Sequence, residues 1–126
     1  MKSNLEVLSE KINNWLQEIA DTDKIPETVK AIYIGIFEGE NTYHLHIAGS
    51  NEFTPQSSDW TCNEDFEPQD KYFDSCIKNT EVNWDAFLNL IVGVIKQYIT
   101  DNPMSYLVMS KHVAVGFDDG DIVSVK

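Results

Sequence analysis

Two histidines at alternate positions of a strand-like segment are the first candidates for chemistry. His44 and His46 flank a single leucine, and side chains two residues apart on a strand share one face. Imidazole is a common metal ligand, and a third ligand could come from His112 or Cys62. Without zinc-motif spacing, such a pair is more typical of partly exposed strand residues. We therefore expect no metal and no cofactor. A small metal- or ligand-binding domain or enzyme that uses this histidine face is the alternative function.

Two further groups could react, but neither has a suitable context. Asp118–Asp121 (DDGD) looks like part of a calcium loop, yet it lacks the glutamate at the twelfth position and suits a hairpin turn. Cys62 stands among acidic residues, which disfavour the thiolate that a nucleophile requires. Nucleophile-elbow and glycine-rich phosphate motifs are missing from the sequence. The sequence therefore predicts no catalytic residues and a protein that is not an enzyme.

The most distinctive stretch is an irregular segment, residues 51–71, which contains two prolines and no sustained period. Long loops in compact domains are uncommon and are often functional. A tryptophan beside closely spaced charges is typical of an interface hot spot. Alternatively, Trp60 and Phe66 pin the loop to the core and leave the acids in water, and both descriptions can hold together. The candidate partner-binding residues are Asp59, Trp60, Glu64, Asp65, Glu67 and Asp70.

Charge restricts the kind of partner. The 126 residues include 21 acidic and 9 basic ones, a net charge of −12. Nucleic-acid binding needs clustered basic side chains, and anionic membrane surfaces repel an acidic chain. We expect neither partner. The acidity serves solubility or steers the protein toward a basic protein partner.

The expected location is the cytoplasm. The N-terminal stretch has no uninterrupted apolar region of the kind that a secretory signal needs. The sequence also contains no apolar run of the ~18–20 residues that a membrane span requires. Its two cysteines, Cys62 and Cys76, are too few for a disulfide framework. Reduced thiols fit a cytosolic protein.

Alternating residues over 29–50 predict a hairpin that positions the histidines. With Glu40 and Asn41 at the turn, Ile36 lies opposite Leu45 and Ile34 opposite Ile47, which gives one aliphatic face. The reverse face then forms a possible secondary contact surface, made of Tyr33, Phe37, His44 and His46.

Two long helices are expected to cover the aliphatic face. One runs from Ser3 to about Ala20 and begins with a capping box between Ser3 and Glu6. The other runs from its N-cap Asn83 to about Asp101. Apolar residues recur at helical spacing in both. The apolar face predicted for the second helix comprises Trp84, Phe87, Leu88, Ile91, Val94, Ile95 and Tyr98.

A second hairpin is expected over His112–Lys126. A three-residue loop with Gly120 in the left-handed conformation would pair Val115 with Val123 and Val113 with Val125. Residues 72–77 could be helical or extended. The prediction is one α+β domain, residues 1–126, in the order α-β-β-loop-α-β-β. A mainly antiparallel four-stranded sheet would carry both long helices on one face.

Three segments carry a resemblance to a known group of proteins. The hairpin over Ile32–Gly49, the stretch Asp59–Phe66 (DWTCNEDF) and the stretch Val115–Asp121 (VGFDDGD) resemble the immunity-protein families of bacterial polymorphic toxin systems. The resemblance implies an acidic, stoichiometric inhibitor without catalytic residues, which occupies a cognate toxin domain. The expected function is therefore a cytosolic acidic protein-binding module that neutralises such a toxin by direct binding.

Overall fold

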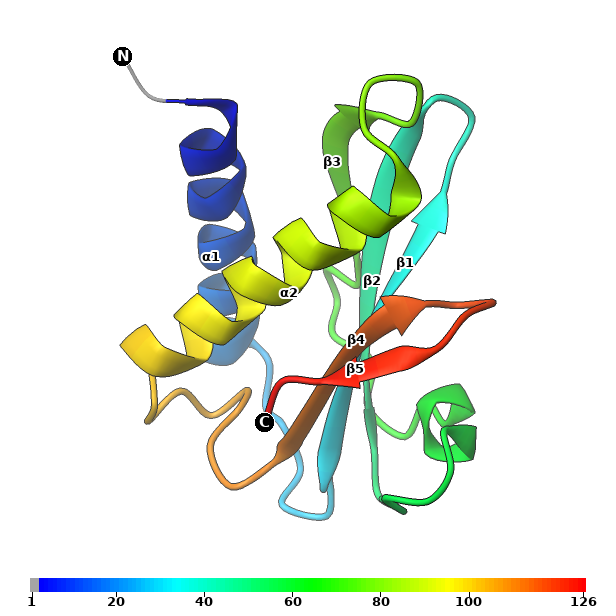
Figure 1. Ribbon diagram of the computed structural model, residues 1–126. Helices are drawn as coiled ribbons and strands as arrows, with labels where there is room; N and C mark the ends of the chain where they lie inside the picture. The colour runs from blue at the N-terminus through cyan, green and yellow to red at the C-terminus, as the bar shows by residue number, and fades with distance from the viewer. Residues whose placement is uncertain (1–2) are drawn as a thin grey trace.

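The structure, a computed structural model that describes residues 3–126, contains a five-stranded mixed sheet and two long helices (Figure 1). The sheet order is β3-β2-β1-β4-β5, and β1 pairs with β4 in parallel while the other three pairs are antiparallel. The elements are α1 (Asn4–Thr22), β1 (Ala31–Glu38), β2 (Thr42–Ser50), a short 3-10 helix η1 (Asp59–Cys62), β3 (Tyr72–Lys78), α2 (Trp84–Asp101), β4 (His112–Phe117) and β5 (Ile122–Ser124).

The α+β class is confirmed, whereas the four-stranded, mainly antiparallel sheet is corrected. The strand that the sequence left undecided is β3, which pairs with β2 along the outer edge of the sheet. Its register shifts between Thr42 and His44, and Cys76 has a φ of 59°. These irregularities break the alternation that identifies a strand. The order of elements is therefore α-β-β-β-α-β-β, with η1 inside the loop between β2 and β3.

The registers of both hairpins are confirmed. Ile36 pairs with Leu45 and Ile34 with Ile47, while Val115 pairs with Val123. The amide of Val125 donates to the carbonyl of Val113 across 2.8 Å, as expected for the end of the second hairpin.

The prediction of a left-handed Gly120 is wrong. No glycine among residues 3–126 has a positive φ. Four residues, 118–121, separate β4 from β5. The Gly120 amide donates to the Phe117 carbonyl across 3.0 Å, which closes an ordinary turn. Such a four-residue loop does not require the left-handed residue of the three-residue form.

The first helix closely follows the prediction. Ser3 is the N-cap, and its hydroxyl accepts from the Glu6 amide across 3.2 Å. The helix continues two residues beyond Ala20, to Thr22. Helical spacing predicts an apolar face of Leu5, Leu8, Ile12, Trp15, Leu16 and Ile19, and all of these except Leu5 are buried. Leu5, in the first turn, is 51% exposed.

The second helix differs from the prediction at its first turn. Asn83 occupies the N-cap position without a side-chain capping bond. Trp84, which helical spacing assigns to the apolar face, is 61% exposed. The rest of that face is buried or half-buried against the sheet, in the main core.

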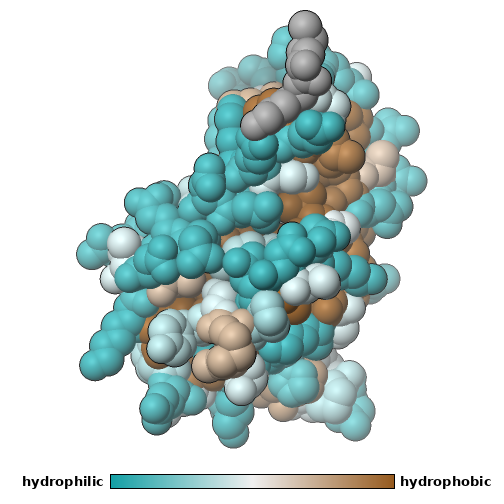
Figure 2. Space-filling model, turned by 90° about the vertical axis from the view of Figure 1, so that its left-hand side faces the viewer, coloured by the Kyte–Doolittle hydropathy of each residue, from teal (hydrophilic) through white to brown (hydrophobic). Residues whose placement is uncertain are grey.

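Both helices cover the same face of the sheet, and together they enclose the main core (Figure 1). The surface on the helix side is largely hydrophilic (Figure 2). A second, smaller cluster lies on the opposite face, where the loop between β2 and β3 packs over Tyr33 and Ala114 through Trp60. Within residues 3–126, neither helix is long and apolar enough to cross a membrane.

Candidate functional site

The loop over residues 51–71 is pinned to the sheet by its aromatic residues. Trp60 is only 4% exposed, and its ring meets those of Tyr33 and Phe53 edge-on, at 6.5 and 5.5 Å between centroids. Phe66 is also buried, and its amide and carbonyl both bond to Gly49 of β2, at 3.1 and 2.8 Å. The structure thus favours the pinned loop, in which Trp60 is a support and not an exposed anchor.

The acidic residues of this loop, in contrast, are exposed. Two of them pair with Lys71, whose Nζ lies 3.1 Å from Glu64 Oε2 and also contacts Glu67. The hydrogen bond from Lys71 lowers the pKa of Glu67 and raises that of Lys71. Asp65 accepts from the Asn51 amide across 2.8 Å. The exposed candidate residues are Asp59, Glu64, Asp65, Glu67 and Asp70.

The four residues of the predicted secondary surface lie together on one face, but Tyr33 is only 5% exposed and belongs to the buried cluster beneath Trp60. Phe37 stacks on His44 with 5.3 Å between ring centroids and lies 5.9 Å from His46, which in turn meets Tyr33 at 5.7 Å. The edge strand β3 adds Tyr72, which is 60% exposed and 6.2 Å from Phe37. Sequence reasoning missed Tyr72 because the strand that carries it was not identified.

The two histidines contact different carboxylates. His44 Nε2 lies 3.3 Å from Thr42 Oγ1 and 4.0 Å from Asp74 Oδ1. His46 Nε2 instead lies 2.8 and 3.0 Å from the two carboxylate oxygens of Asp118. Over residues 3–126, no group of three or more His, Cys, Asp or Glu residues could hold a metal ion.

A polar network joins Tyr33, Asp118 and His46 at the middle of the sheet. The Tyr33 hydroxyl donates to Asp118 Oδ1 at 3.0 Å and to the Gly116 carbonyl at 3.1 Å. Because a carboxylate only accepts, His46 Nε2 carries the hydrogen. Burial, and secondly the charge of Asp118, raise the pKa of Tyr33 well above its usual value near 10. The phenol therefore remains a hydrogen-bond donor at neutral pH.

Gly35 makes room for this network. A Cβ at Gly35 would lie 2.1 Å from His46 Nε2 and 2.4 Å from Asp118 Oδ1. Both side chains thus lie directly over the backbone of β1, and a larger residue would displace them. The reason for a glycine at this position is close packing, not an unusual backbone angle.

The network fixes the orientation of the His46 ring through its Nε2 nitrogen. In catalytic triads, a carboxylate on one imidazole nitrogen leaves the other to activate a hydroxyl or thiol. Here His46 Nδ1 is buried and has no hydrogen-bond partner among the described residues. The geometry fits a structural role, in which Asp118 ties the β4–β5 hairpin to β1 and β2. Asp118 was missed as a site residue because local sequence does not show that β4 lies beside β1.

In comparisons with known proteins, no family model, curated protein or solved structure matches the chain.

Proposed function

We propose that this chain is an acidic protein-binding module that inhibits a basic protein partner by covering part of its surface. The observation that carries the proposal is the exposed acidic loop, residues 59–70, held in place by the buried side chains of Trp60 and Phe66. The net charge of −12 favours the same kind of partner. A cognate toxin domain, as the resemblance to immunity proteins implies, is the partner that we propose.

Rigidity is the physical advantage of this loop. A loop that is already ordered loses less conformational entropy when it binds. Carboxylates at fixed positions also steer a basic partner toward them and accelerate association. In this proposal Trp60 supports the surface from beneath, and Tyr72 supplies an exposed aromatic contact beside Lys71. The acidic contacts are Asp59, Glu64, Asp65, Glu67 and Asp70.

The reverse face of the first hairpin extends this surface. Phe37 and His46 adjoin Tyr72, and His44 stacks on Phe37, so one partner could cover the loop and the histidine face together. The proposal places the complex in the cytoplasm, where Cys62 and Cys76 remain free thiols.

The test begins with a tagged chain and a lysate of the native organism. Bound proteins are identified after low- and high-salt washes, and the purified partner is assayed for toxicity with and without this chain. Association rates are then compared for the wild type and Asp59→Lys/Asp70→Lys. These two residues leave the Lys71 ion pairs intact. We expect a basic partner, loss of its toxicity at one equivalent, and association slowed about tenfold at low salt.

The control is a second double variant with the same change of charge at positions outside the loop. Glu18→Lys/Glu27→Lys alters two other exposed acids, so it reports the effect of net charge alone. Equal slowing by both pairs would show that the loop is not the contact. A partner that is acidic, or that stays toxic when bound, would contradict the proposed function itself.

A further inference from the structure

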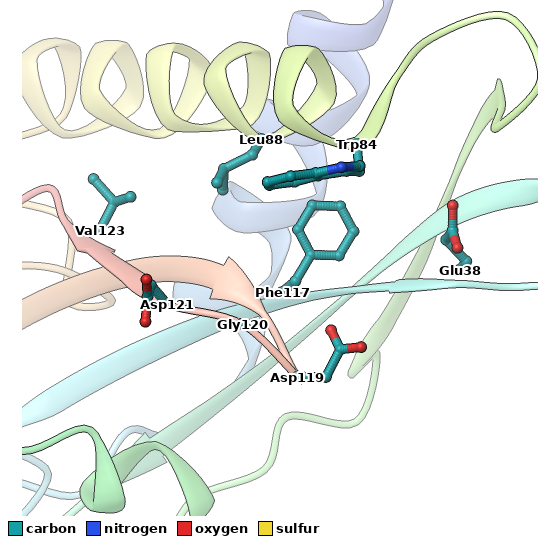
Figure 3. A pocket seen from close by; sticks show the side chains of 8 residues that line it. All are labelled: Glu38, Trp84, Leu88, Phe117, Asp119, Gly120, Asp121 and Val123. Atoms are coloured by element: carbon teal, nitrogen blue, oxygen red, sulfur yellow. The ribbon is translucent and has the colours of Figure 1, made fainter.

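A cavity of about 580 Å³ lies apart from the loop and the histidine face, between the first turn of α2 and the β4–β5 hairpin (Figure 3). Its walls combine four apolar side chains with three acidic ones and a glycine. The residues that line it are Glu38, Trp84, Leu88, Phe117, Asp119, Gly120, Asp121 and Val123.

Trp84 and Phe117 form an aromatic wall of this cavity, in which Trp84 is exposed and Phe117 is held by the core. Trp84 is 61% exposed, whereas the other two tryptophans, Trp15 and Trp60, are each 4% exposed. The Trp84 ring stands edge-on to Phe117 at 6.0 Å, and Phe117 meets the buried Tyr43 at 6.1 Å. Tyr43 is in turn stacked on a core phenylalanine at 4.2 Å. The core therefore positions this wall before any ligand arrives.

The rim of the cavity is negative. Glu38, Asp119 and Asp121 contribute three carboxylates, and none of the described residues that line the cavity is basic. The start of α2 nearby carries about half a positive charge from the helix dipole. Asp85 in the first turn of α2 opposes that charge, so three full negative charges dominate the site. An anionic ligand is disfavoured.

We propose that this cavity binds an arginine side chain of the protein partner. A guanidinium group is planar, stacks on tryptophan and pairs with carboxylates through several N–H donors. The aliphatic stem of the arginine would contact Leu88 and Val123, while the charged end would face Asp119 and Glu38. As a partner contact, this inference rests on the proposed function, but the chemistry of the cavity can be tested without the partner.

The test uses N-acetyl-arginine methylamide as the ligand and NMR as the readout. The tryptophan indole N–H signals resolve the three side chains, and the buried Trp15 and Trp60 serve as internal references. We expect the arginine amide to shift the Trp84 signal and the Gly120 amide. The uncharged norleucine amide should not shift them.

Variants then assign the two parts of the site. Trp84→Ala should weaken arginine-amide binding about fivefold, measured at the Gly120 amide, because a cation–π contact is worth roughly 1 kcal/mol. Asp119→Asn/Asp121→Asn should weaken it by a similar factor. The control Asp59→Asn/Asp70→Asn removes equal charge from the loop and should change it less than twofold.

Several results would overturn the inference. Equal shifts with norleucine amide would indicate a purely apolar groove, and stronger binding of lysine amide would contradict the stacked guanidinium. Equal effects of the two Asp→Asn pairs would mean that overall charge alone attracts the ligand. Without any perturbation of Trp84 by the arginine amide, the cavity is not an arginine site.

Experiments with the partner protein distinguish a failure of this inference from a failure of the proposed function. If the arginine amide binds but no basic partner is inhibited, the proposed function fails and the arginine site stands. If a partner binds and Trp84→Ala leaves its affinity unchanged, the cavity is not a contact, although the proposed function survives.

Discussion

The two faces of the sheet are built differently. The helix face contains aliphatic side chains from β1, β2 and β4, packed against α1 and α2 in one continuous core. The opposite face carries aromatic and polar side chains, with a small buried cluster around Tyr33 and Trp60. Area buried on the first face stabilises the fold, while exposed groups on the second remain able to contact a partner. The comparison shows that the continuous core lies on one side of the sheet, while the other side combines a smaller core with exposed aromatic and polar groups.

The largest effect should come from the helix face. Leu45 is fully buried in the main core, so Leu45→Ala should lower the free energy of unfolding by about 3 kcal/mol, through lost burial and a residual cavity. Urea denaturation followed by circular dichroism measures this change. A loss below about 1 kcal/mol would show that the core is loosely packed, and the contrast between the faces would disappear.

A smaller and more local effect is expected on the other face. Trp60→Ala should cost about 2 kcal/mol or less, since the loop can partly collapse around the missing ring. Hydrogen exchange should accelerate mainly in residues 51–71 and leave the helices protected. The exposed Met104 gives a matched control, Met104→Ala, with no expected change. Uniformly faster exchange across the chain would mean that both faces unfold as one unit.

The smallest effect concerns pH. Folding raises the pKa of Tyr33 above 10, so above pH 10 the unfolded chain releases this proton while the folded chain retains it. The free energy of unfolding therefore falls as pH rises through this range. Tyr33→Phe should cost about 1 kcal/mol at neutral pH through its lost hydrogen bonds. It should also flatten the decline above pH 10, measured by urea denaturation between pH 8 and 11.

Some decline should persist in Tyr33→Phe, because the pKa values of Tyr43 and Tyr98 are raised as well. An unchanged slope in the variant would show that Tyr33 is not protected from ionisation by the fold.

Local patterns in the sequence correctly predicted the features that depend on residues close together in the chain: a helix, a strand register and the grouping of side chains on one strand face. The helix around Leu8 and Trp15, the register of Ile36 with Leu45, and the grouping of Phe37 with the histidines all follow from residue periodicity. Periodicity also placed Trp84 on the apolar face. It misjudged the exposure of Trp84 because the spacing along a helix does not show how far the partner surface extends.

What the sequence did not reveal depends on contacts between distant segments. Tyr72 belongs to an edge strand whose alternation is interrupted at Cys76. Asp118 reaches His46 only because β4 lies parallel to β1, an arrangement that no local pattern encodes. The cavity beside Trp84 likewise needs the second hairpin and α2 to meet. Each of these features requires the strand order before it can be inferred.

The parallel pairing of β1 with β4 also bears on how the chain folds. β1 and β2 are joined by a short turn, but Ala31 finds its β4 neighbour His112 only across a long intervening segment. Closing so large a loop costs more conformational entropy than closing a hairpin, so β4 is expected to pair with β1 more slowly than β2 does. Until β4 docks, the backbone amides and carbonyls on one edge of β1 have no strand partner, and the isoleucines of the central strand lack part of their cover. Before β4 pairs with β1, the middle of the finished sheet is a free edge, so we expect the docking of β4 to remove an edge that could otherwise pair with another chain.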